Sequence, residues 1–262
     1  MRGLAGRALL LALAAGSLAM GPGAPPPEYG RVVLGRSARK AGVPAVGFDH
    51  WRHRALFTCR LCHVDVGFAM AAGETGVTAS TNRSGFHCGA CHDGKRLHQE
   101  KPLFAACAEG GRIDDPAAAC RRCHAGPGGA ARRAEEFARI TAGLPRDRLG
   151  HVDWERAEAE RRVRPVDQLP GLSIPRRPLE MKKEVAIASG AAWMDGILFS
   201  HPKHSVWNGC EVCHPDIFPS THSGQARYSM LQISSGEYCG VCHGRVAFPL
   251  GDCERCHKRP VR

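Results

Sequence analysis

The sequence predicts a mostly irregular fold with short α-helices, made of two copies of one unit and a helical, proline-rich connector. Three observations lead to this prediction. The five-residue pattern CxxCH occurs six times and uses twelve of the thirteen cysteines. When the chain is shifted by 151 residues, 48–92 aligns with 199–243 without a gap, which indicates a duplication. Residues 127–196, between the two copies, contain no cysteine.

The segment 1–21 has the pattern of a secretory signal peptide. Arg2 and Arg7 precede an apolar run that extends from Ala8 to about Met20, and small residues surround a plausible cleavage site. The run is shorter than the ~20 residues that a membrane-spanning helix needs, and the stretch GPGAPPPEYG follows it. We therefore expect an exported, periplasmic protein; an uncleaved anchor helix is the alternative.

The CxxCH pattern indicates covalent attachment of c-type haem. A disulfide framework or zinc sites would also use cysteine pairs, but neither explains a histidine after every second cysteine. In this motif the two thiols form thioethers with the haem and the histidine ligates the iron. The sequence therefore predicts six covalently attached c-type haems, with attachment residues Cys59, Cys62, Cys88, Cys91, Cys120, Cys123, Cys210, Cys213, Cys239, Cys242, Cys253 and Cys256. The proximal iron ligands are His63, His92, His124, His214, His243 and His257.

Six haems change what the size and charge of the chain imply. About 40 residues serve each haem, which is fewer than a conventional apolar core needs, so we expect the porphyrins to form much of the core. The formal net charge of +11 raises the possibility of nucleic-acid binding. Export and the negative charges of the haem propionates argue against it. We expect no nucleic-acid partner.

Four further histidines recur in register ahead of the first CxxCH of each half. FDHWRH at 48–53 aligns with FSHPKH at 199–204, so that His50 and His53 correspond to His201 and His204. A spacing of three places both rings near one face of a helix. Two neighbouring haems can then each take one of them as distal ligand.

These motifs together resemble the triheme cytochrome c7 family, which is related to cytochrome c3 but lacks one haem. The resemblance covers about 46–124 and 197–257. It implies two haem-cored triheme units, at 46–126 and 197–262, joined by the connector at 127–196. It also implies that the first histidine of each pair ligates the first haem and the second histidine the second haem. The resulting pairs are His50 with His63, His53 with His92, His201 with His214 and His204 with His243.

The distal ligand of the third haem in each unit stays open. The family supplies a histidine four residues ahead of the second CxxCH, where this chain has Ser84 and Ser235. In the second unit, the stretch MLQISSGEYCGVCH resembles a methionine-containing segment of multidomain relatives, so Met230 and His222 are both candidates. A methionine ligand would raise the haem potential. In the first unit Ala79 takes the Met230 position, and the candidates are Met70, His87 and His98.

The connector is expected to hold two short charged helices, at 130–140 and 153–164, the second capped by Asp153. A proline-rich extended stretch follows them. We favour a spacer between the halves over a docking site for a partner. His151 is either a surface histidine or an iron ligand from outside the units. Cys107 is a partly buried bystander, a thiol that pairs between molecules or an unusual iron ligand.

These features favour an electron carrier without enzymatic activity. Family resemblance and export imply an inner-membrane electron donor and an exported or outer-membrane cytochrome as acceptor. The alternative is a multihaem reductase in which one five-coordinate haem acts on a small oxyanion or metal ion.

Overall fold

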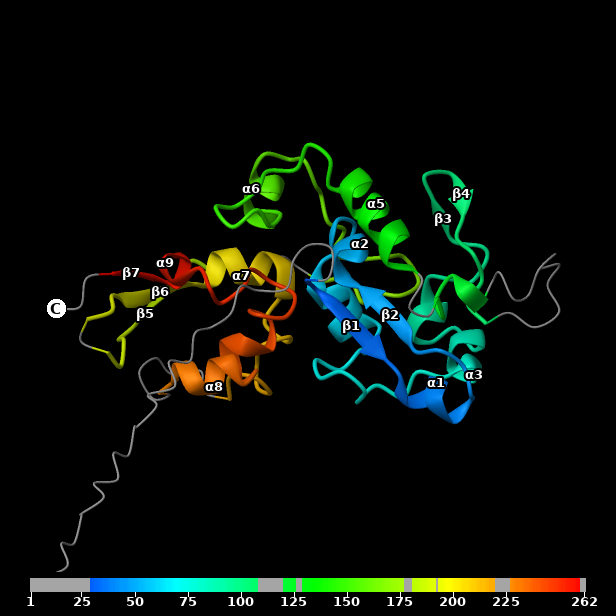
Figure 1. The fold of residues 1–262 in the computed structure, drawn as a ribbon, viewed down its shortest axis with the longest axis horizontal. Helices are drawn as coiled ribbons and strands as arrows, with labels where there is room; N and C mark the ends of the chain where they lie inside the picture. Colours follow the sequence, from blue (N-terminus) through cyan, green and yellow to red (C-terminus); the bar gives the residue numbers. More distant parts are fainter. Residues whose placement is uncertain are drawn as a thin grey trace, which may run out of the picture.

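The computed structural model describes residues 29–107, 120–125, 129–176, 181–191, 193–219 and 227–259. The predicted signal peptide and His222 lie outside these ranges. The described residues form short helices and three small sheets joined by irregular segments, as the sequence predicts (Figure 1). None of the helices in these ranges is both long and apolar enough to cross a bilayer.

The first half begins with a two-stranded antiparallel sheet. β1 (Arg31–Leu34) and β2 (Val46–Asp49) pair with each other, and α1 (Arg36–Lys40) lies between them in the chain. Helix α2 (His50–Arg54) starts directly after β2 and therefore fixes the histidine pair to the end of this strand. The remaining elements of this half are η1 (Leu61–Asp65), α3 (Ala79–Arg83), η2 (His87–Ala90), β3 (Leu97–His98) and β4 (Lys101–Pro102).

The second half repeats this order. β5 (Glu184–Ile187) pairs antiparallel with β6 (Gly196–Ser200), and α7 (His201–Asn208) starts directly after β6. β5 lies in the segment expected as connector, yet it completes the hairpin of the second half. The elements that follow are α8 (Met230–Ser234), η4 (Tyr238–Val241), α9 (Cys253–Cys256) and β7 (His257–Arg259), the last of which pairs with β6.

Helices α3 and α8 start at positions that the internal repeat aligns, and each begins with a capping box. The Thr78 hydroxyl accepts from the backbone N–H of Thr81, and the Ser229 hydroxyl accepts from that of Gln232. In both helices the third residue also bonds back to the cap, which satisfies two terminal N–H groups. The duplication thus extends to the local signals that start the helices.

The connector contains the two predicted helices, α5 (Ala130–Ile140) and α6 (Trp154–Ala159). The Asp153 carboxylate accepts from the backbone N–H of Arg156 and caps α6 as expected. The helix ends at Ala159 and does not continue to 164, because the chain turns there to bury Val163. Both helices lie along the upper side of the molecule, between the first half on the right and the second half on the left (Figure 1).

Ion pairs join the connector to both halves. Arg176 bonds to Asp65 of the first half at 2.6 Å and lies 3.5 Å from Glu211 of the second half. The Asp65 side chain is only 2% exposed, so the buried carboxylate needs the Arg176 guanidinium to offset its loss of hydration. Further pairs are Arg52 with Glu136, Arg60 with Asp167, Lys203 with Glu155, Arg148 with Asp252 and Arg255 with Asp147. The connector thus contacts both halves along its length.

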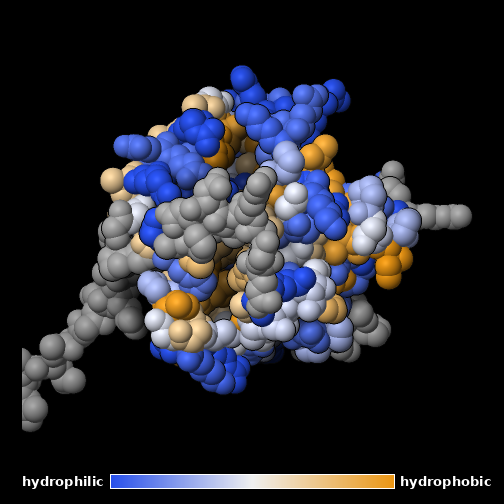
Figure 2. All heavy atoms as spheres, turned by 90° about the vertical axis from the view of Figure 1, so that its right-hand side faces the viewer, coloured by the Kyte–Doolittle hydropathy of each residue, from blue (hydrophilic) through white to orange (hydrophobic). Residues whose placement is uncertain are grey.

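The apolar core of the polypeptide is small. Nine apolar side chains are buried in the described ranges, among them Trp51, Leu61, Trp207 and Ile233. On the face that points right in Figure 1, apolar residues lie interspersed with polar ones at the surface (Figure 2). Such a core is small for a chain of this length and fits a protein whose interior includes another apolar group.

Candidate haem-binding sites

Four of the six histidines that end a CxxCH motif are oriented by a backbone carbonyl. In each case the ring nitrogen Nδ1 donates its proton to the carbonyl, so that the lone pair of Nε2 is available to a metal. The pairs are His63 with Phe68 at 2.8 Å, His124 with Pro44 at 2.6 Å, His214 with Phe218 at 2.5 Å and His257 with Asp195 at 2.6 Å. This bond fixes the tautomer and ring orientation that an imidazole needs for ligating a metal through Nε2.

The second motif of each half uses an aromatic ring. His92 lies against Phe104 with ring centres 4.3 Å apart, and His243 lies against Phe248 at 4.2 Å. Burial lowers the pKa values of both histidines, and the carbonyls of these phenylalanines offset part of that shift, although the Nδ1 atoms do not reach hydrogen-bond geometry. Both rings are therefore held in the same way in the two halves.

The recurring histidine pairs are oriented by the same principle. Nδ1 lies 2.8 Å from the Gly30 carbonyl in His50, 3.1 Å from the Lys183 carbonyl in His201 and 2.8 Å from the Ser200 carbonyl in His204. In His53 the Nδ1 atom forms no hydrogen bond; burial lowers the pKa of this ring, and the Asp49 carbonyl, at the position that corresponds to Ser200, offsets part of that shift. Seven of the ten histidines thus donate Nδ1 to a backbone carbonyl.

The second histidine of each pair faces a proximal histidine at a distance that suits an iron between them. The ring centres of His53 and His92 are 6.3 Å apart, and those of His204 and His243 are 6.2 Å apart. Two metal–imidazole bonds of about 2 Å each, plus the distances from the ring nitrogens to the ring centres, add up to roughly 6 Å. His50 also lies within electrostatic range of His63.

Burial keeps these imidazoles neutral. It lowers the pKa values of His50, His53 and His243 to about 4, because a charged ring is poorly solvated there. A neutral imidazole is the form that ligates a metal. Together with the free Nε2 atoms, this property fits an iron ligand.

The motif cysteines are suited to thioether bonds rather than to disulfides or thiolate sites. Burial raises the pKa values of Cys62 and Cys242 to about 12 and those of Cys88 and Cys256 to about 11. All thirteen cysteines are free, so a disulfide framework is not present among them. Within the described ranges, no group of three or more histidine, cysteine or acidic side chains is arranged to hold a metal ion directly.

A glycine packs the second motif of each half against the preceding helix. A Cβ atom on Gly89 would lie 1.8 Å from the Asn82 carbonyl oxygen, and one on Gly240 would lie 1.8 Å from that of Ile233. Only glycine allows this approach. Both glycines belong to the CGxCH sequence that the two halves share, but the sequence analysis assigned them no role.

The chain matches the family described as cytochrome c7 and related cytochrome c over residues 46–125 and 197–258. These two regions together make up more than half of its 262 residues. The protein belongs to this cytochrome c7 family. The predicted family, the duplicated fold and covalently attached c-type haem as cofactor are thereby confirmed.

Two solved structures are also similar to this cytochrome. The structure of the dodecaheme cytochrome c GSU1996 matches with 22% identity and a TM-score of 0.27, covering 91% of this chain and 50% of that one. The structure of the C-terminal hexaheme fragment of GSU1996 matches with 22% identity and a TM-score of 0.27. The match covers 90% of this chain and 99% of the fragment. The cytochrome thus spans about half the length of the dodecaheme protein. No curated protein matches it.

The His87 ring of this cytochrome lies at an aromatic position. His87 and Tyr238 occupy equivalent sites with the same backbone φ of 51°. The His87 ring centre is 5.5 Å from that of Phe68, and the Tyr238 ring centre is 6.1 Å from that of Phe218. The Nδ1 atom of His87 also lies 3.3 Å from the Thr81 hydroxyl. The first half has a histidine at this position and the second half has a tyrosine. The position itself therefore does not require an iron ligand.

The other candidates for the third haems lie in separate places. Met230 is the first residue of α8 and is 45% exposed, whereas its counterpart Ala79 starts α3. Met70 is half-buried in a bend, and His98 is half-buried in β3. His222 lies outside the described residues. Within the described ranges, no hydrogen bond or ring contact joins Met230, Met70 or His98 to a third motif.

Cys107 and His151 also occupy defined positions. Cys107 lies within electrostatic range of Cys88 and Cys123, and its sulfur is 3.7 Å from the Asn82 amide nitrogen. Its side chain is exposed rather than partly buried. The His151 side chain is only 12% exposed, and its ring centre lies 5.4 Å from that of Tyr29. His151 is therefore not the surface residue that the sequence favoured.

Proposed function

We propose that this cytochrome carries six haems and passes single electrons along them without making or breaking substrate bonds. The proposal depends on one observation: seven of the ten histidines donate Nδ1 to a backbone carbonyl and so leave Nε2 for iron. When haem is bound, its iron accepts and releases the electron. Rigidly oriented histidines would suit this task, because their positions would not need to change when an electron is gained or lost.

The proposed ligand sets follow the family. The two units, 46–126 and 197–262 with the connector 127–196, each bind three haems through their CxxCH motifs. His53 serves the haem at His92 and His204 the haem at His243; the equal ring distances of 6.3 and 6.2 Å support both pairs. His50 and His201 serve the haems at His63 and His214. The candidates for the haem at His257 are Met230 and His222.

The attachment cysteines support a continuous haem chain. Cysteines of successive motifs lie near one another, and the series runs from Cys123 through Cys88, Cys62, Cys59, Cys213 and Cys239 to Cys256. The third motif of the second half includes α9, at the left end of the molecule in Figure 1, and α3 beside the second motif of the first half lies toward the right end. Electrons would enter at one end and leave at the other.

We place this pathway in the cell envelope. The signal-peptide pattern at 1–21 supports export to the periplasm. An inner-membrane donor and an exported or outer-membrane cytochrome as acceptor are the proposed partners. The six haems carry propionates that offset the positive charge of the chain, so nucleic acid is not among the partners proposed.

One observation favours a second function, a reductase with an open haem. Ala79 stands where the second half has Met230, so the third haem of the first unit lacks that ligand. An iron with five ligands would bind a small oxyanion or a metal ion. This candidate differs from the carrier in the coordination of a single iron.

The test is the visible spectrum of the reduced mature protein before and after addition of carbon monoxide, with its mass as a count of haems. A mass below six haems would refute the haem count. An unchanged spectrum is expected for the carrier, because two protein ligands close every iron. A shift of the Soret band would reveal an open iron and favour the reductase.

A further inference from the structure

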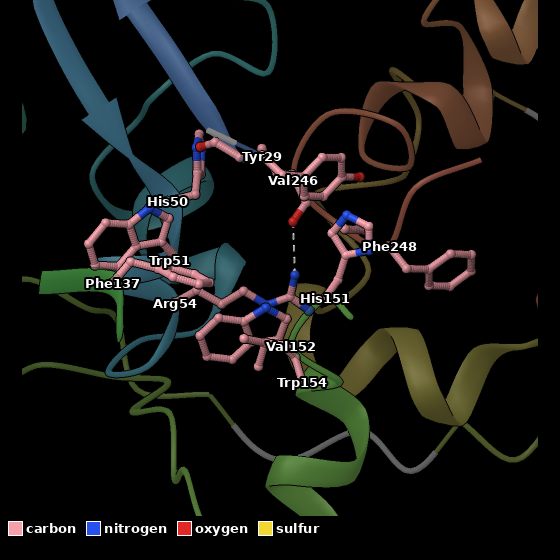
Figure 3. Close-up of a pocket in the computed structure, with 12 residues that line it drawn as sticks. Tyr29, His50, Trp51, Arg54, Phe137, His151, Val152, Trp154, Val246 and Phe248 are labelled. Atoms are coloured by element: carbon pink, nitrogen blue, oxygen red, sulfur yellow. Dashed lines mark hydrogen bonds between the residues drawn. The ribbon is translucent and has the colours of Figure 1, made fainter. Parts of the chain in front are cut away.

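The two halves and the connector meet at the side chain of Arg54, the last residue of α2. Its guanidinium Nη1 donates to the Val246 carbonyl of the second half at 3.0 Å. It also lies over the ring of Trp154 in α6, at 5.3 Å, and over that of Trp207 in α7, at 5.0 Å. Figure 3 shows Arg54 reaching from α2 toward Val246 beside the ring of Trp154. One cation thus contacts three separate segments.

The Arg54 side chain is half-buried with its Nε atom inaccessible to solvent, and no carboxylate of the described ranges pairs with it. Burial lowers the pKa of Arg54, but a guanidinium remains charged at any physiological pH. No ion pair joins Arg54 to an acidic group of the described ranges, and its Nε atom has no hydrogen-bond partner. Glu158 offsets the charge only through a longer-range electrostatic interaction. A net positive charge therefore remains in a region of low dielectric constant, where its field is strong.

Haem attachment sites of both halves lie next to this charge. Val246, whose carbonyl accepts from Arg54, donates its backbone N–H to the Cys242 carbonyl of the second unit at 2.9 Å. The Cys59 thiol of the first unit lies close to both the guanidinium and the Cys242 thiol. In the haem-loaded protein these sulfurs are bonded to porphyrin edges. The edges of one haem from each unit therefore meet at Arg54.

The internal repeat indicates that this junction is one-sided. The position that corresponds to Arg54 in the second half is Ser205, and the one that corresponds to Trp207 in the first half is Leu56. Arg54 and Trp207 therefore each occur in only one of the two halves. A residue needed for folding every unit would be expected in both.

We propose that Arg54 is a positioning residue for electron transfer between the units, a fixed cation that holds two haem edges together and favours their reduced states. A reduced haem carries one more electron than an oxidised haem, so the nearby positive charge stabilises it. The haems attached at Cys59 and Cys242 are then easier to reduce than they would be without Arg54. This inference rests on the proposed electron-transfer function.

The test is a spectroelectrochemical titration of the haem-loaded full chain and its Arg54→Gln variant. Glutamine retains a donor for the Val246 carbonyl but removes the charge. Two of the six haems are expected to titrate at lower potential, with about a tenfold change in the ratio of oxidised to reduced haem at a fixed potential, or about 59 mV. Arg54→Lys should restore the wild-type curve, because the charge and not the stacking sets the potential.

Arg156→Gln is the matched control, because Arg156 lies on the connector helix α6 but is exposed and paired with Glu160. Its curve should match wild type. Six attached haems with an unchanged titration in Arg54→Gln would overturn the inference. If that variant loses haem, Glu158→Gln decides: the same two haems should titrate at higher potential, and an unchanged curve would refute the charge effect. Failure of the proposed function is separable, since the wild-type protein would then lack six reversibly titrating haems.

Discussion

The close contact of Gly240 with α8 leads to a prediction for both the thermal stability of the protein and the ligation of one haem. An alanine Cβ at this position would lie 1.8 Å from the Ile233 carbonyl oxygen, whereas ordinary contact begins at 3.4 Å. The motif and the helix must therefore move apart until this contact lengthens from 1.8 Å to 3.4 Å. The carbonyl cannot turn away, because it accepts from the backbone N–H of Gly236 at 3.0 Å and closes the end of α8.

This separation acts on the haem site because Gly240 lies inside the motif that ends in His243. The His204 and His243 ring centres, 6.2 Å apart, leave room for one iron and two bonds. Moving the motif away from the helix should break one of these bonds. We expect Gly240→Ala to lose about 1–3 kcal/mol of stability, as overpacked sites do. That loss corresponds to about 2–4 °C in Tm for each kcal/mol in a chain of this size.

The assay is thermal unfolding followed by Soret circular dichroism, together with a spectrum that counts high-spin haem. Gly76→Ala is the control, because a Cβ there meets nothing within 4 Å. Its Tm should stay the same or rise slightly, since alanine reduces the freedom of the unfolded chain. Equal Tm values for the two variants, with every haem low-spin in Gly240→Ala, would refute the packing argument.

Three further predictions concern ligation and the connector. His53→Ala should keep six attached haems but convert one iron to high-spin; a wholly low-spin spectrum would contradict its pairing with His92. Met230→His should move one haem to lower potential in a redox titration, because methionine ligation raises potentials; an unchanged curve would exclude Met230 as a ligand. Arg176→Ala should cost about 1–3 kcal/mol in denaturant unfolding, because it leaves the buried Asp65 carboxylate without its partner. A midpoint equal to that of wild type would show that this pair contributes nothing to stability.

The local signals of the fold were predictable because each one lies within a few residues. The Asp153 cap and the helix that follows it depend on a bond between residues three apart. The end of α6 was not predictable. It depends on the burial of Val163 and on the bond from the Thr58 N–H to the Val166 carbonyl, which joins segments far apart in the chain.

The orientation of the histidines also required the tertiary structure. The sequence names His124 and His257 as ligands, but their partners are the backbone carbonyls of Pro44 and Asp195. Any residue type supplies a carbonyl, so no side-chain pattern marks these partners. The equivalent orientation of the two rings is visible only once both are placed.

The sequence by itself determined the cofactor, the family and the duplication, because a CxxCH motif holds all its chemistry within one short segment and a repeat is visible by alignment. The tertiary structure decided how the two halves meet. Arg54 has no motif, and its contacts with Trp154 and the Val246 carbonyl bring together segments up to 192 residues apart. Such a junction depends on how the connector packs against both halves, and that packing follows from long-range burial and charge pairing rather than from local sequence.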